Sequence, residues 1–187
     1  EYLDFVAGLS INNLGHCHPA VVKAAQAQMA ELINTCNLYY TKPGGDLAEL
    51  LSDLSLGGKV FFSNSGAEAN ACAIKLARKY GHDIGGADKH RIITLENGFH
   101  GRTMAALSAT AQPEKQAPFK PLLPGFMYVP PNDINAMKAV VDSSVCAIIL
   151  EVIQGEGGIH PLDEDYLVAV RKLADEPLQF RLAISLH

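Results

Sequence analysis

The chain has 187 residues, of which 48% are hydrophobic and 19% charged, as in an ordinary globular domain. The formal net charge is −5 and no block of basic residues is present, so nucleic acid and an anionic membrane surface are excluded as predicted partners. The longest apolar run, residues 145–150, is too short to cross a bilayer. Four scattered cysteines, without C-x-x-C spacing or a visible secretory signal, predict free thiols, no metal site and a cytoplasmic location.

The hydrophobic pattern predicts helices that alternate with short apolar strands. Helices are expected at residues 19–33, 45–54 and 67–80, from a cap at 132 or 133 to 141, and from 163 or 165 to 174. Strands are expected at 59–63, 91–96, 126–129 and 145–150, with a polar loop at 81–89. A continuous apolar strand is typical of a parallel sheet that is buried on both faces. The sequence therefore predicts an α/β fold with a mostly parallel sheet and flanking helices.

The motif S-G-A-E-A-N at residues 65–70 lies at a predicted strand–helix junction. Ser65 can cap the helix while Glu68 reaches back to the amide of Ser65, the arrangement of a capping box. The first amides of a helix have no internal partner and carry partial positive charge, and Gly66 leaves room for an anion there. The motif predicts a phosphate cradle. The same residues also fit a strand–helix junction without a ligand, and both interpretations stay open on this loop alone.

Two further loops follow the strands at 91–96 and 145–150, and in a parallel sheet all three loops meet at one edge. Phe99 can stack on a planar ring or fill the core. Arg102 suits a substrate carboxylate, or it is a solvated surface charge. Glu151 and Glu156 are a carboxylate pair, but a glycosidase is disfavoured because no aromatic platform accompanies them. Together the three loops favour a planar phosphorylated cofactor that handles amino acids.

At this point the sequence resembles the class III (subgroup II) pyridoxal-phosphate aminotransferases, most closely the acetylornithine/succinylornithine group. The resemblance extends from residue 1 to about residue 176. The matching motifs are E-Y-L-D-F-V-A-G, N-N-L-G-H-C-H-P, N-L-Y-Y, F-F-S-N-S-G-A-E-A-N, F-H-G-R-T and I-Q-G-E-G-G. It implies the large domain of a fold type I transferase, with pyridoxal 5'-phosphate (PLP) as cofactor, amino acid and 2-oxo acid substrates, and a homodimer. The family reaction transfers an amino group from N-acetylornithine to 2-oxoglutarate.

The resemblance also implies a role for individual residues. The cofactor phosphate would be held by Ser65, Gly66 and Ala67. Phe99 would stack on the pyridine ring, and Glu151 would lie in the surroundings of the cofactor.

Substrate contacts are implied in the same way. Arg102 would bind the α-carboxylate of the substrate, and Tyr39 and Tyr40 would line the substrate entrance. Glu156 resembles a carboxylate that swings with a distant arginine to admit two different substrates.

The resemblance ends at about residue 176. Beyond this point the family has an aspartate that pairs with the pyridine nitrogen of the cofactor, and then the lysine that binds the cofactor covalently. Here the chain reads P-L-Q-F-R-L-A-I-S-L-H, and none of its ten lysines stands in a matching context. No catalytic residue is therefore assigned, and the chain as written is expected not to transaminate. The predicted parts are an N-terminal segment at 1–44, a partial PLP-binding domain at 45–176 and a divergent tail at 177–187.

Several alternatives stay open. Leu182, Ile184 and Leu186 alternate with smaller or polar residues and can form one replacement strand, or the tail is disordered. The chain could be a non-enzymatic remnant that binds PLP or pairs with full subunits. It could also be part of an ornithine, succinylornithine or 4-aminobutyrate aminotransferase, which share these loops. An unrelated phosphate-binding module explains only the first loop.

Overall fold

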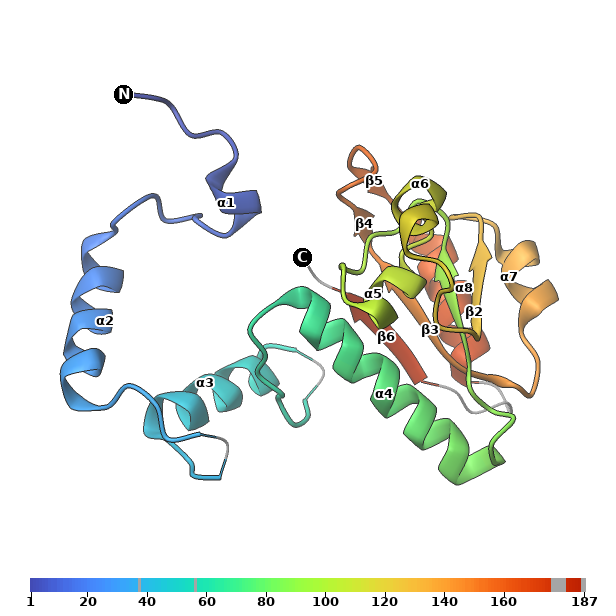
Figure 1. Cartoon of the computed structure of the whole chain (residues 1–187), viewed down its shortest axis with the longest axis horizontal. Helices are drawn as coiled ribbons and strands as arrows, with labels where there is room; N and C mark the ends of the chain where they lie inside the picture. The colour runs from blue at the N-terminus through green and yellow to red at the C-terminus, as the bar shows by residue number, and fades with distance from the viewer. Residues whose placement is uncertain (37, 56, 176–180, 186–187) are drawn as a thin grey trace. The chain divides into compact units, whose positions relative to one another are not determined.

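The computed structural model describes residues 1–36, 38–55, 57–175 and 181–185, and it divides the chain into two compact units, Glu1–Val60 and Phe61–His187. In the first unit (blue to cyan in Figure 1) the helices are α1 (Ala7–Ser10), α2 (Pro19–Glu31) and α3 (Lys42–Asp53). A proline stands in the first turn of α2 and of α3, where its missing amide costs no hydrogen bond. The two expected helices are confirmed, and α3 begins three residues earlier than predicted.

The second unit contains a parallel four-stranded sheet in the order β2-β1-β3-β6. Its strands are β1 (Arg91–Leu95), β2 (Phe126–Val129), β3 (Val145–Glu151) and β6 (Arg181–Ser185). A short antiparallel hairpin, β4 (Ile153–Gln154) and β5 (His160–Pro161), follows β3. The predicted mostly parallel sheet is confirmed. The tail forms a strand over residues 181–185, as one of the two alternatives expected, whereas residue 186 lies outside the described residues.

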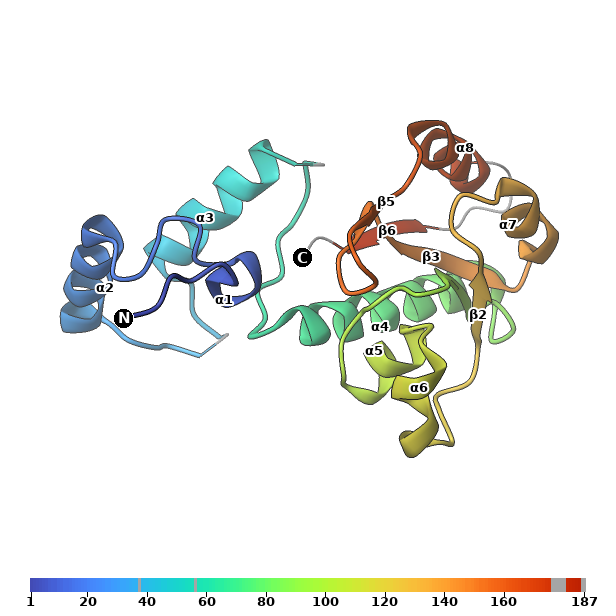
Figure 2. The ribbon, with the colours of Figure 1, turned by 90° about the horizontal axis from the view of Figure 1, so that it is seen from above.

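Helices cover both faces of this sheet (Figure 2). One face carries α4 (Gly66–Gly85) and α5 (Met104–Ala109), followed by α6 (Pro113–Gln116) and a 3-10 turn (Ala117–Phe119). The other face carries α7 (Ile134–Val140) and α8 (Glu164–Asp175). The side chain of Asp133 caps α7 by accepting hydrogen bonds from the amides of Asn135 and Ala136.

The core lies in two layers, one on each face of the sheet, and β3 contributes to both. Val145, Ile148 and Leu150 pack toward α7 and α8, whereas Ala147 and Ile149 pack toward α4. Every residue of β3 is buried, which confirms the strand predicted from the continuous apolar run. The α/β fold class is likewise confirmed.

Two sequence-based expectations are wrong. Residues 59–63 form no strand, because a strand exists only beside a partner with which its amides and carbonyls pair, and none of the described strands pairs with it. The expected loop at 81–89 is also displaced, since α4 continues to Gly85. Gly81 is buried where a Cβ atom would lie 2.6 Å from the Cβ of Cys146, so this glycine allows α4 to pack closely rather than ending it.

All four cysteines are free. Among the described residues, no helix is both long enough and apolar enough to span a membrane.

Candidate cofactor site

The N-terminus of α4 is capped by Ser65, whose Oγ accepts a hydrogen bond from the amide of Glu68 at 3.2 Å. The other half of the predicted capping box is shifted by one residue. The carboxylate of Glu68 accepts a hydrogen bond from the amide of Asn64 at 2.8 Å, rather than from the amide of Ser65. Its second oxygen lies 3.5 Å from the side-chain amide of Asn64, so the carboxylate contacts both groups of Asn64. The amides of Gly66 and Ala67 open the helix, where the first amides have no intrahelical acceptor and attract anions.

The loop after β1 packs directly against this helix end. A Cβ atom on Gly101 would lie 2.5 Å from the Cβ of Ala67, and the φ of Gly101 is +119°, so only glycine fits this approach. The side-chain amide of Asn70 donates a hydrogen bond to the carbonyl of His100 at 2.8 Å, and the amide of His100 donates to Thr110 Oγ1 at 2.9 Å. These contacts fix the loop to the first two turns of α4.

Glu151, at the carboxyl end of β3, positions Phe99. Its Oε2 accepts a hydrogen bond from the amide of Phe99 at 2.8 Å, and the residue is only 3% exposed. The Gln112 side chain donates to the carbonyls of Asn97 at 3.1 Å and Gly98 at 3.3 Å. The backbone around Phe99 is therefore held from several sides, which leaves a half-buried aromatic ring in a defined place.

Two cationic groups lie at the ring of Phe99, and a carboxylate pairs with one of them. Arg102 Cζ lies 5.9 Å from the ring centroid, and Lys115 Nζ lies 4.9 Å from it. Both distances are within the range of a cation–π interaction. Lys115 Nζ also forms an ion pair with Glu156 Oε2 at 3.1 Å.

The structure thus brings together seven of the nine residues that the sequence singles out. The connected set is Ser65, Gly66, Ala67, Phe99, Arg102, Glu151 and Glu156. Tyr39 and Tyr40 lie in the first unit, where both are exposed, and their role at a substrate entrance stays a prediction. Asn70 belongs to the motif at residues 65–70, although its contact with His100 was not expected. Lys115 and the supporting residue Gln112 belong to none of the motifs. Nothing in their local pattern marks them, because their contacts are made only by the folded chain.

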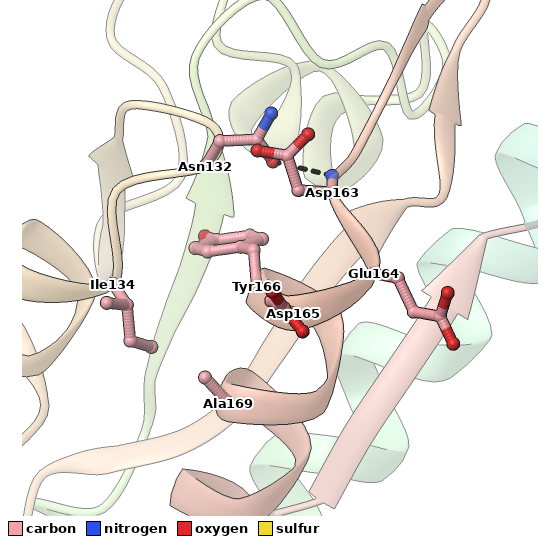
Figure 3. Close-up of a pocket in the computed structure, with 7 residues that line it drawn as sticks. All are labelled: Asn132, Ile134, Asp163, Glu164, Asp165, Tyr166 and Ala169. Atoms are coloured by element: carbon pink, nitrogen blue, oxygen red, sulfur yellow. Dashed lines mark hydrogen bonds between the residues drawn. The ribbon is translucent and has the colours of Figure 1, made fainter.

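A separate pocket of about 570 Å³ lies over the start of α8 (Figure 3). Its acidic side chains do not converge, since Glu164 points away from Tyr166 in this view. The amide of Asp163 donates a hydrogen bond to Asn132 Oδ1 at 3.0 Å, and acidic residues are ordinary in the first turn of a helix. Among the described residues, no three His, Cys, Asp or Glu side chains are placed to hold a metal ion. The helix end at Ser65 with the ring of Phe99 is therefore the better candidate site.

The residues of this site suit a planar phosphorylated molecule. Free amides at the start of α4 are suited to a phosphate, an aromatic ring lies on the loop that packs against Ala67, and Arg102 offers a fork of donors for a carboxylate. The loop that carries Phe99 thus packs against the first turn of α4, where the amides have no intrahelical acceptor.

Comparison with known proteins identifies the class. The family described as aminotransferase class-III matches residues 1–179. The acetylornithine aminotransferase of Caldanaerobacter subterraneus subsp. tengcongensis is 57% identical over 175 residues, which are 94% of this chain and 44% of that protein. The chain belongs to the class-III aminotransferase family, whose cofactor is PLP.

Solved structures agree with this assignment. The chain is similar to the N-acetylornithine aminotransferase of Stenotrophomonas maltophilia, with a TM-score of 0.80, 35% identity, and coverage of 98% of this chain and 45% of that one. It is also similar to an ornithine aminotransferase of Toxoplasma gondii that has partial occupancy of PLP at its active site, with a TM-score of 0.90, 31% identity, and coverage of 98% and 44%. The chain spans less than half the length of each of these relatives.

Proposed function

We propose that the second unit carries the PLP-binding residues of an aminotransferase of the acetylornithine type. The observation that carries this proposal is the packing of Gly101 on Ala67, because it joins an anion-binding helix end to the loop that presents Phe99. The amides of Gly66 and Ala67, with the Ser65 hydroxyl, would hold the cofactor phosphate, and Phe99 would stack on its ring. When bound, PLP supplies an electron sink for chemistry at an amino-bearing carbon.

In this proposal the other residues orient the cofactor and the substrate. Glu151 holds the amide of Phe99 and so fixes the stacking ring. Arg102 binds a substrate carboxylate through its guanidinium, which can form two parallel hydrogen bonds. Glu156 pairs with Lys115, which lies at the same ring, and contributes to the choice of substrate. Tyr39 and Tyr40 line the entrance.

The proposed reaction is transfer of an amino group from N-acetylornithine to 2-oxoglutarate, in the cytoplasm, by a homodimer. Identity supports acetylornithine as the donor, since the acetylornithine aminotransferases of Caldanaerobacter and Stenotrophomonas are 57% and 35% identical and the ornithine aminotransferase of Toxoplasma 31%. We further propose that the 187 residues alone bind the cofactor without transaminating, because none of their ten lysines stands in the family context. The proposed parts are residues 1–44, 45–176 and 177–187.

The test compares two helix caps, Ser65 on α4 and Asp133 on α7. Each is changed to alanine, and each change is expected to lower the free energy of unfolding by about 1 kcal/mol. Only Ser65→Ala should weaken PLP binding, by about tenfold or 1.4 kcal/mol, measured by the cofactor absorbance with inorganic phosphate as competitor. Equal weakening by both variants, or no binding of PLP by the unaltered protein, contradicts the proposal. Borohydride treatment of the PLP-loaded protein should leave all ten lysines unlabelled, and a labelled lysine overturns the claim of inactivity.

A further inference from the structure

Lys115 is a charged residue at the candidate site to which neither the sequence motifs nor the family resemblance assigns a role. Its ammonium group lies 4.9 Å from the centroid of Phe99 and 3.1 Å from Glu156 Oε2. The side chains of Lys115 and Glu156 are 31% and 42% exposed, so the pair is only partly screened by solvent. The two residues are separated by 41 positions in the sequence and meet only in the folded chain.

The backbone beneath Lys115 is firmly held. The amide of Lys115 donates to the carbonyl of Gln112 at 3.0 Å, and the side chain of Gln112 donates in turn to the carbonyls of Asn97 and Gly98, next to Phe99. The next residue, Gln116, is buried, and its side chain donates to the carbonyl of Thr110 at 2.7 Å. The short helix α6 is therefore tied to the loop that carries Phe99, which places Lys115 near this ring.

Charged groups of both signs lie close together in this part of the chain. Arg102 supplies one positive charge for a carboxylate, while Glu156 supplies a negative charge 3.1 Å from Lys115, the other cation at this ring. A ligand with one carboxylate needs only Arg102. A second carboxylate placed near Glu156 would be repelled, because like charges repel unless a cation neutralises one of them.

We propose that Lys115 is a positioning residue that holds and neutralises Glu156, and that this ion pair sets the acceptance of dicarboxylates relative to monocarboxylates. The proposal rests on the proposed function, in which one substrate is a dicarboxylic 2-oxo acid. It assigns the resting partner of Glu156 to a lysine within this stretch of chain, whereas the resemblance implies only a distant arginine. Lys115 acts through Glu156 and is not required to touch the substrate.

The experiment uses two unreactive ligands of equal chain length, glutarate with two carboxylates and pentanoate with one. Their dissociation constants are measured by calorimetry on the unaltered protein and on Lys115→Ala, Lys115→Arg and Glu156→Gln. Lys115→Ala should weaken glutarate binding by about tenfold, which equals about 1.4 kcal/mol, and should leave pentanoate binding unchanged. Glu156→Gln should strengthen glutarate binding, and Lys115→Arg should restore most of the loss because it keeps the positive charge.

The double variant separates positioning from direct binding. If Lys115 acts through Glu156, Lys115→Ala should change glutarate binding by no more than about twofold in the Glu156→Gln background, since the charge to be neutralised is absent. Lys138→Ala, which removes an exposed lysine on α7, provides the same change in net charge and should have no effect.

Three results overturn the inference. They are equal weakening of both ligands by Lys115→Ala, a full tenfold effect that persists in the double variant, and no glutarate binding by the unaltered protein. Failure of the proposed function is seen separately, as the absence of PLP absorbance, because the calorimetric comparison needs no cofactor signal.

Discussion

The two units of the chain bury their apolar residues to very different extents. In Glu1–Val60 no described side chain is buried, although α2 and α3 carry valine, leucine and methionine. In Phe61–His187 two clusters of buried apolar residues lie on either side of the sheet, and every residue of β3 is buried. Both regions follow the apolar periodicity expected of their elements, yet only the second forms a core.

This difference in burial shows that packing against the sheet provides the stability of the second unit and the geometry of its candidate site. Helices in water are stabilised mostly by packing of an apolar face, and intrinsic propensity alone is marginal at this length. The candidate site lies at the carboxyl edge of the well-packed sheet, where Glu151 ends a fully buried strand and fixes Phe99. Rigid support of this kind is what a binding site needs, and the helices of the first unit do not receive it from side chains of their own.

Truncation of one large apolar residue in each unit gives the largest expected contrast. Ile148→Ala removes a fully buried side chain of β3 and should lower the free energy of unfolding by about 2–5 kcal/mol. Leu50→Ala shortens a side chain of α3 that is 54% exposed, and it should change the free energy of unfolding by about 0.5 kcal/mol or less. Denaturant unfolding measures both. A large loss from Leu50→Ala would break the contrast, because it would mean that this surface is covered in the protein in solution.

Replacing one helical glycine in each unit by alanine should change the stability of the protein in opposite directions. Gly81→Ala places a Cβ atom 2.6 Å from the Cβ of Cys146 and closer still to the carbonyl of Lys89, so it should destabilise the protein by about 1–3 kcal/mol. Gly45→Ala adds a Cβ atom in α3 with nothing within 4 Å. It should stabilise the protein by about 0.4–1 kcal/mol, because alanine has the higher helix propensity. Thermal unfolding of the two variants checks the signs, and stabilisation by Gly81→Ala would contradict the packing described here.

Local sequence patterns predict much of the secondary structure of the second unit. The continuous apolar run at 145–150 predicts β3, and Ser65 with Glu68 predicts the start of α4, because both signals depend on neighbours in the chain. The strand expected at 59–63 is wrong for the opposite reason. Apolar composition favours a strand, but pairing requires a partner that the composition does not specify.

The sequence motifs predict the residues of the candidate site, but they do not predict the residues that support it. Phe99 and Arg102 stand in a recognisable loop, whereas Lys115 reaches that ring from a short helix whose polar residues resemble any surface turn. Gln112 and Gln116 are likewise buried polar residues whose partners are distant carbonyls. Such contacts depend on the path of the chain and not on the residue type, so no local pattern reveals them.

Replacing one tyrosine in each unit by phenylalanine should give the smallest change in the free energy of unfolding. For the tyrosine of the second unit, this change should also depend on pH. The hydroxyl of Tyr166, in the first turn of α8, is buried without a hydrogen-bond partner among the described residues, whereas Tyr40 in the first unit is fully exposed. A buried hydroxyl without a partner is costly, so Tyr166→Phe should raise the free energy of unfolding at pH 7 by about 1 kcal/mol. Tyr40→Phe should leave it unchanged.

Burial, with a smaller contribution from the charge of Asp133, raises the pKa of Tyr166 from 10.0 to about 12. The folded protein therefore holds the phenol proton more tightly than the unfolded chain does. The free energy of unfolding is therefore unaffected by this ionisation below pH 10 and falls as the pH rises toward 12. Urea unfolding from pH 9 to pH 12 should show the unaltered protein losing stability in this window relative to Tyr166→Phe, while Tyr40→Phe follows the unaltered protein. If Tyr166→Phe destabilises the protein at pH 7, the hydroxyl forms a hydrogen bond in the protein in solution. The difference in burial between the two units is then smaller than the structure indicates.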